Sequence, residues 1–235
     1  MSRYAQQIIV PEVGANGQQK IAAARVLLIG AGGLGTPAAA YLAAAGVGTI
    51  GLADGDTIAL SNLPRQFLYN ESEAGQPKAT LLAIKLKQQN PSILINTYPV
   101  MINEGNVHSI INEYDIVCDC TDNAATRILV DKLCGELKKP LVYAVVKDWE
   151  GYVTVLHHRR NITLDTIFSH SALLENAALN CSVSGIINTT CGIAGSMQAG
   201  EVLKIILGIN SDLDGGICCF NTAGPVFKMF TLQKI

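Results

Sequence analysis

The chain has 235 residues, of which 49% are hydrophobic and 15% charged, and its formal net charge is −2 at pH 7. This composition is typical of a folded globular protein, and it argues against a broad basic surface for nucleic acid. No apolar run approaches the ~20 residues that a membrane-spanning helix requires, so we expect no membrane association. The seven cysteines contain no C-x-x-C pair, which favours free thiols and a cytoplasmic location.

Short apolar runs alternate with helical segments through the first part of the chain. After a short N-terminal arm and a polar helix at 17–24, we expect strands at 25–29, 48–53, 93–98, 116–118 and 141–146, and helices at 34–45, 76–89, 104–112 and 123–136. Regular alternation of this kind predicts a Rossmann-like α/β fold, with a mostly parallel sheet and helices on both faces.

The pattern changes after residue 151. We expect a strand at 152–156, little regular structure over 157–180, a long helix at 189–207, and two antiparallel strands at 217–220 and 226–232. An irregular stretch of this length inside a compact domain is usually functional. We therefore interpret residues 1–235 as a single domain with three parts: a nucleotide-binding core (1–156), a crossover loop (157–188), and a C-terminal helix with strands (189–235).

A glycine-rich turn separates the first strand from the helix that follows it. Gly30, Gly32 and Gly35 fit the pattern G-x-G-x-x-G, with Gly33 beside them. Such glycines allow a tight turn, and they let phosphates approach the N–H groups at the helix start. Asp54 ends the second strand, where an acid can accept hydrogen bonds from ribose hydroxyls. The pattern predicts nucleotide binding but does not separate NAD from ATP; the alternative is a tight turn beside a solvated aspartate.

Charged residues further along favour a triphosphate over a nicotinamide. Arg65 and Lys78 follow the second strand, and Asp122 follows the fourth. Two cations suit phosphoryl or nucleotidyl transfer, and one carboxylate with phosphate oxygens suits Mg²⁺. None of the four histidines stands at an obvious strand end, so a proton relay for hydride transfer is missing. The alternatives are that Lys78 is a solvated surface lysine and that Asp122 caps the following helix.

Together these segments resemble the ThiF/MoeB/HesA family, bacterial relatives of the ubiquitin-activating enzymes. The matching segments, in chain order, are Arg3-Tyr4 with Gln7-Ile8, Gly30 to Gly35, Asp54-Gly55-Asp56, Ser61-Asn62 to Arg65-Gln66, Gly75 to Lys78, Cys120 to Asn123, Glu150-Gly151, and Met197-Gln198-Ala199 with Glu201 and Lys204. The resemblance covers essentially the whole chain. D-G-D, followed by S-N-L-x-R-Q and then G-x-P-K, is specific to this family and not a general Rossmann feature.

The resemblance implies a homodimeric adenylyltransferase that uses ATP and Mg²⁺. Its substrate would be the C-terminal Gly-Gly carboxylate of a small ubiquitin-like sulfur carrier, ThiS-like for thiamine thiazole or MoaD-like for molybdopterin. Asp54 would hold the ribose, Asp122 would position the magnesium, and Asn62 would share the phosphates with the two cations. The implied nucleotide-binding residues are Gly30, Gly32, Gly33, Gly35, Asp54, Asp56, Asn62, Arg65, Gln66, Lys78, Asp122 and Asn123. The implied catalytic residues are Arg65, Lys78, Asp122 and Cys181.

Two other functions stay open. A related adenylating enzyme could act on tRNA or a peptide, and a catalytically impaired nucleotide-binding scaffold is a further alternative. The second is motivated by Gln6, which stands where many relatives carry an arginine that reaches ATP across the dimer. Relatives also often hold structural zinc through two C-x-x-C pairs. This chain lacks both pairs, and the adjacent Cys218 and Cys219 would point to opposite faces of a strand, so we expect no zinc.

The cysteines differ in their expected roles. Cys181 falls where some relatives carry a cysteine that links covalently to the carrier, which makes it the candidate nucleophile. Cys191 starts the long helix, where the dipole favours a thiolate. We expect Cys118 and Cys134 in the core. Cys120 lies between two aspartates, whose charges are expected to raise its pKa.

Overall fold

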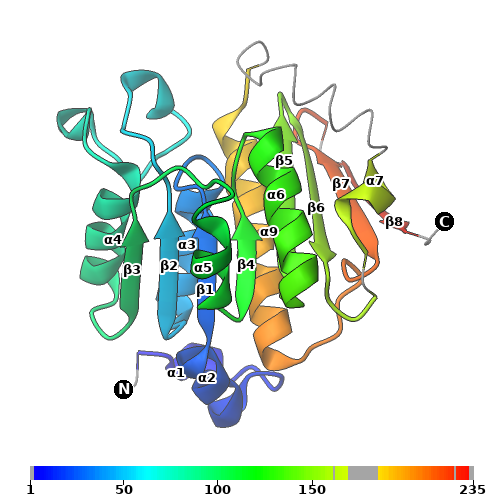
Figure 1. Cartoon of the computed structure of the whole chain (residues 1–235). Helices are drawn as coiled ribbons and strands as arrows, with labels where there is room; N and C mark the ends of the chain where they lie inside the picture. Colours follow the sequence, from blue (N-terminus) through cyan, green and yellow to red (C-terminus); the bar gives the residue numbers. More distant parts are fainter. Residues whose placement is uncertain (1–2, 161, 169–184, 225, 233–235) are drawn as a thin grey trace.

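The computed structural model describes residues 3–160, 162–168, 185–224 and 226–232. These residues contain an eight-stranded sheet of order β3-β2-β1-β4-β5-β6-β7-β8 (Figure 1). The first five strands run parallel, and the last three continue the sheet antiparallel. They are β1 (Arg25–Ile29), β2 (Thr49–Ala53), β3 (Leu94–Tyr98), β4 (Ile116–Asp119), β5 (Leu141–Lys147), β6 (Glu150–Leu156), β7 (Gly216–Asn221) and β8 (Val226–Thr231). The predicted Rossmann-like sheet is confirmed.

Helices cover both faces of the sheet (Figure 1). They are α1 (Ala5–Ile8), α2 (Gly14–Ala23), α3 (Gly35–Ala45), α4 (Lys78–Gln89), α5 (Val107–Asn112), α6 (Ala124–Leu137), α7 (Leu164–Ile167) and α9 (Asn188–Leu207), with the 3₁₀ turns η1 (Leu60–Asn62) and η2 (Glu71–Glu73). α3, α4 and α9 contribute to one apolar cluster, and α5 and α6 to a second. None of the described helices is long and apolar enough to span a bilayer.

β1 shows why the apolar runs become central strands. Val26 and Leu28 face the first apolar cluster, whereas Leu27 and Ile29 face the second. A strand buried on both faces reads as a continuous apolar run, because alternate side chains enter different cores. The register also positions the site: Ile29 lies opposite Ala53 of β2 and opposite Asp119 of β4. The chain therefore leaves all three strands at one edge of the sheet.

Several predicted boundaries differ from the structure. The helix predicted at 76–89 begins at Lys78, because Pro77 has extended ψ and acts as the N-cap. Two short helices were not predicted, α1 and α7; α7 is only four residues long, too short to show a helical period, and begins with a capping box between Thr163 and Thr166. Residues 169–184 of the predicted crossover loop lie outside the described residues, so the three-part division stays a prediction.

Candidate functional site

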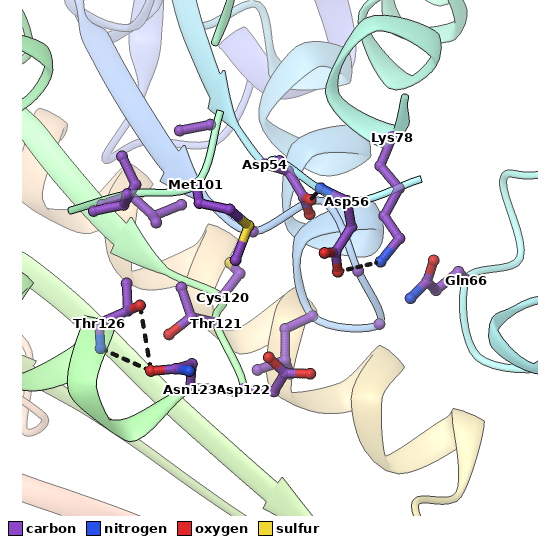
Figure 2. Close-up of a pocket in the computed structure, with 18 of the residues that line it drawn as sticks. Asp54, Asp56, Gln66, Lys78, Met101, Cys120, Thr121, Asp122, Asn123 and Thr126 are labelled. Carbon is purple, nitrogen blue, oxygen red and sulfur yellow. Dashed lines mark hydrogen bonds and ion pairs between the residues drawn. The ribbon is translucent and has the colours of Figure 1, made fainter. Parts of the chain in front are cut away.

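A pocket opens at the carboxyl ends of the parallel strands, where ligands bind in open α/β sheets. Its empty volume is about 930 Å³ when the solvent-filled mouth is included. The predicted residues that line it are Gly30, Gly32, Gly33, Asp54, Asp56, Arg65, Gln66, Lys78, Asp122 and Asn123. Gly35 and Asn62 are not among its lining residues, and Cys181 lies outside the described residues. In Figure 2, Asp54, Asp56 and Lys78 lie on one side of the pocket, and the segment from Thr121 to Thr126 lies on the other.

The glycine turn forms the floor of the pocket between β1 and α3. Gly30 has φ +101°, and a Cβ there would lie 2.5 Å from the carbonyl oxygen of Cys120. A Cβ on Gly35 would lie 2.0 Å from the carbonyl oxygen of Gly30. Gly35 therefore serves the site by allowing the turn to close, although it does not line the pocket. In the first turn of α3 the N–H groups of Thr36 and Ala38 already donate to the carbonyls of Gly32 and Leu34, and Pro37 has no N–H. An anion in the pocket would therefore meet the backbone of the turn itself, at Gly32 and Gly33.

Asp54 holds the glycine turn from the end of β2. Its Oδ2 accepts a hydrogen bond of 2.7 Å from the N–H of Ala31, and its Oδ1 accepts one of 2.8 Å from the N–H of Asp56. Burial raises the pKa of Asp54, while these two backbone hydrogen bonds oppose the rise. Each carboxylate oxygen keeps a second lone pair for a ligand hydroxyl. The residue predicted to hold a ribose thus also fixes the glycine turn.

Lys78 is a buried cation at the first residue of α4. Its side chain is 6% exposed, and Nζ lies 2.9 Å from Oδ2 of Asp56, whose side chain is 59% exposed (Figure 2). The alternative of a solvated surface lysine is therefore wrong. A cation at a helix N-terminus opposes the helix dipole, and burial removes part of its hydration. A phosphate in the pocket would offset both costs.

Arg65 and Gln66 reach the pocket from the turn after η1. The backbone carbonyl of Asn62 accepts hydrogen bonds from the N–H groups of both residues, at 3.1 and 3.0 Å. Asn62 thus supports this turn through its main chain. Arg65 is half-buried and donates through Nη1 to the carbonyl of Ser61 at 3.0 Å. Gln66 is 3% exposed, and its Oε1 has no hydrogen-bond partner. An unsatisfied buried amide oxygen in a pocket wall suits a ligand donor.

The segment after β4 carries the predicted metal carboxylate. Asn123 caps α6, because its Oδ1 accepts from the N–H of Thr126 at 3.0 Å (Figure 2). The alternative that Asp122 is the cap is therefore wrong, and its exposed side chain lines the pocket. No group of three or more His, Cys, Asp or Glu side chains gathers to form a metal site within the described ranges. A magnesium ion here would depend on phosphate oxygens as well as Asp122, which is its usual coordination with nucleotides.

Comparison with known proteins decides the family. The ThiF family model matches residues 4–234. The chain belongs to the ThiF family. This confirms the resemblance drawn from the glycine turn, the D-G-D segment and the Arg-Gln and Pro-Lys motifs.

Relatives in the ThiF family carry adenylyltransferase names. The chain is 35% identical to the "Sulfur carrier protein adenylyltransferase" of Thermus thermophilus, over 100% of this chain and 88% of that protein. It is 40% identical to "Adenylyltransferase and sulfurtransferase MOCS3" of Mus musculus, over 99% of this chain and 50% of that protein. It is 36% identical to the "Probable molybdopterin-synthase adenylyltransferase" of Gracilaria tenuistipitata var. liui, over 98% and 64%. The chain thus spans about half to two thirds of the length of several relatives that it matches.

Solved structures agree on the fold. E. coli MccB with ATP superposes with a TM-score of 0.85 at 22% identity, over 100% of this chain and 72% of that chain. SeMet PaaA superposes with a TM-score of 0.83 at 18% identity, over 98% and 82%. At this level of identity the likeness concerns the fold alone.

Some pocket residues of this ThiF family protein were not predicted. Val100, Met101 and Ile102 follow β3 and form an apolar wall; Gly55 lets this wall approach, because a Cβ there would lie 2.5 Å from the N–H nitrogen of Met101. The apolar run after a strand end was the available signal. Arg127 also lines the pocket, four residues beyond Asn123 on the same helix face. That spacing was its only signal in the sequence.

The cysteines near the pocket are poor nucleophiles. Hydrogen bonding to the Cys118 thiol at 3.8 Å, burial, and the charge of Asp119 raise the pKa of Cys120. The expected rise is confirmed, although a cysteine and not two aspartates contributes most. Burial raises the pKa of Cys191 to about 11, so the predicted thiolate-favouring effect of the helix start is outweighed. Cys118 and Cys134 are buried in the core, as predicted.

Proposed function

We propose that this protein is an adenylyltransferase that activates the C-terminal Gly-Gly carboxylate of a small ubiquitin-like sulfur carrier. The observation that carries the proposal is the buried Lys78 at the glycine-turn pocket, because a cation in this position favours a triphosphate over a nicotinamide. The name of the Thermus thermophilus relative, which the chain matches over 88% of its length, supports the carrier as substrate.

The nucleotide is proposed to lie across the pocket from floor to wall. The phosphates would contact the backbone N–H groups of Gly32 and Gly33 in the glycine turn, with Lys78 and Arg65 beside them. The ribose hydroxyls would donate to the Asp54 carboxylate, and the base would pack on Val100 and Met101. Asp122 and phosphate oxygens would hold Mg²⁺, which neutralises phosphate charge when it is bound.

The proposed reaction needs no general base. A carrier carboxylate is already ionised at neutral pH, so its oxygen can attack the α-phosphorus directly. The new bond joins the carboxylate oxygen to the α-phosphorus. As it forms, the bond between the α-phosphorus and the oxygen bridging to the β-phosphate breaks, and its electron pair leaves with pyrophosphate. The products are the carrier acyl-adenylate and pyrophosphate. Lys78 and Arg65 would stabilise the negative charge that builds on the transferred and departing phosphates.

A homodimer in the cytoplasm is part of this proposal. The N-terminal arm lies far from the pocket of its own subunit, since Arg3 Nη1 donates to the carbonyl of Gln89 at 3.0 Å. Gln89 ends α4, whereas Lys78 begins it. If Arg3 or Gln6 contributes to a nucleotide site, that site belongs to another subunit.

An ATP–pyrophosphate exchange assay with a purified diglycine-tailed carrier tests the proposal. We expect labelled pyrophosphate to enter ATP only when the carrier is present. The same carrier without its last glycine is the matched control and should support no exchange. ATP binding with no exchange for any sulfur carrier would instead favour the scaffold alternative, and exchange driven by a peptide or tRNA would favour the other adenylating enzymes.

A further inference from the structure

We propose that Arg127 is a positioning residue, which fixes the segment after β4 so that the Asp122 carboxylate meets the metal–nucleotide complex. This inference rests on the proposed function, because it takes Asp122 as the metal carboxylate. Arg127 would act through the main chain of Thr121, the residue before Asp122, and not by contact with ATP.

The contacts of Arg127 join three elements. Its Nη2 donates to the carbonyl oxygen of Thr121, and its Nη1 donates to the hydroxyl oxygen of Tyr143 at 2.9 Å. Its guanidinium also lies over the ring of Tyr143, 5.2 Å from the centroid. Tyr143 belongs to β5 and is 2% exposed, so it is a fixed support. Arg127 thus ties the segment after β4 to α6 and β5 through a planar, two-pronged donor.

Thr121 is also held from the other direction. Its N–H and its hydroxyl both donate to Oδ1 of Asp119, at 2.9 and 2.7 Å. Asp119 is fully buried at the end of β4. Its carbonyl oxygen accepts a 2.7 Å hydrogen bond from Nε2 of Gln198 on α9. Helices on both faces of the sheet therefore fasten residues 119–121.

These contacts fix the orientation of the backbone at Asp122. The peptide group between Thr121 and Asp122 is planar, so the bond from Arg127 to its carbonyl also fixes the direction of the Asp122 N–H. Asn123, the next residue, is fixed in turn as the cap of α6. Asp122 is thus held between two anchored residues, with its carboxylate at the pocket. Without Arg127, the Thr121 carbonyl loses its donor, and the direction of Asp122 is no longer set from that side.

Metal affinity measured without turnover tests this role. The probe is Mn²⁺, followed by electron paramagnetic resonance, on protein loaded with the non-reacting analogue α,β-methylene ATP. We expect Arg127→Met to weaken Mn²⁺ binding about 10-fold, as is typical for the loss of an outer partner of a metal ligand. Affinity for the analogue without metal should change much less. Arg127→Lys keeps the charge but cannot span both oxygens, so its loss should be intermediate.

Arg25→Met is a matched control at the other end of β1. Arg25 also donates to a main-chain carbonyl, that of Glu113 at 2.6 Å, and also lies over a tyrosine ring, that of Tyr114 at 5.5 Å. Its loss should leave Mn²⁺ binding unchanged. If Arg127→Met does not fold, Tyr143→Phe is the milder variant, which keeps the ring but removes one acceptor, and it should weaken Mn²⁺ binding in the same direction.

The outcomes separate the two proposals. Folded Arg127 variants that bind Mn²⁺ as tightly as the wild type, while Asp122→Asn weakens it, would overturn the role of Arg127 alone. An equal loss in Arg25→Met would overturn it too, because the effect would then be general destabilisation. If Asp122→Asn itself leaves Mn²⁺ binding unchanged, the metal assignment fails and the inference fails with it. Absence of pyrophosphate exchange in the wild type speaks against the proposed function only.

Discussion

The ion pair between Lys78 and Asp56 should respond very differently to loss of its two partners. Lys78 is buried and Asp56 is mostly in solvent. Removing Asp56 therefore leaves a buried cation without its partner, whereas removing Lys78 leaves a carboxylate that water can solvate. We compare Asp56→Asn with Lys78→Met, since methionine fills a similar volume without charge.

The expected magnitudes follow from this exposure. Asp56→Asn should lower the free energy of unfolding by about 1–3 kcal/mol, because the amide oxygen can still accept from Nζ but the buried cation loses its counter-charge. Lys78→Met should change it by less than about 1 kcal/mol, because an ion pair with one exposed partner contributes little. The order reverses for catalysis: loss of a charge at the transferring phosphates should cost Lys78→Met about 3 kcal/mol, or about 100-fold in kcat/KM for ATP.

Urea unfolding and steady-state exchange kinetics measure the two quantities on the same proteins. Lys85→Met is the matched control, since Lys85 also lies on α4 and pairs with Glu73 at 2.8 Å but does not line the pocket. It should leave kcat/KM for ATP unchanged. The reasoning is refuted if Lys78→Met destabilises the fold more than Asp56→Asn does, or if Lys85→Met impairs ATP use equally.

Three further measurements test the pocket. Gly30→Ala should cost more stability than Gly75→Ala in thermal unfolding: both have positive φ, worth about 1–2 kcal/mol, but only at Gly30 does a Cβ meet backbone, whereas Gly75 has nothing within 4 Å. Asp54→Asn turns an amide N–H₂ toward a backbone donor and should weaken ATP binding about 10-fold in calorimetry; unchanged affinity would contradict the turn-holding role. Cys191, with a pKa of about 11, should react slowly with iodoacetamide at pH 7.5, which peptide mass spectrometry checks; rapid labelling would show a reactive thiolate.

The sequence predicted the parts of the site that depend on local pattern. An apolar run, a glycine-rich segment and an Ala-rich stretch predicted the strand, turn and helix that form the pocket floor, and Asp54 followed from its place at the next strand end. These features are readable because burial on both faces and positive φ each restrict residue type. The boundaries were less accurate, as at Pro77, where the chain enters α4.

The features of the site that depend on packing between distant segments could not be predicted from the sequence. Residue type alone does not distinguish a buried lysine from a solvated one, so only the structure reveals that Lys78 is buried and paired with Asp56. Asp122 and Asn123 are equally good caps by type, and the one that caps is decided by a shift of one residue. Arg127 meets Thr121 and Tyr143 only because α6 folds back over β4 and β5. The nucleophilic role of Cys181 stays a prediction.

Calorimetric titration of the purified chain with ATP and Mg²⁺, beside a titration with NAD, tests the central claim most directly. That claim is that the cations of the pocket are placed for a triphosphate. We expect ATP to bind, NAD to show no measurable heat, and Lys78→Met to weaken ATP binding while Lys85→Met does not. NAD binding as tight as that of ATP, with both indifferent to Lys78, would contradict it.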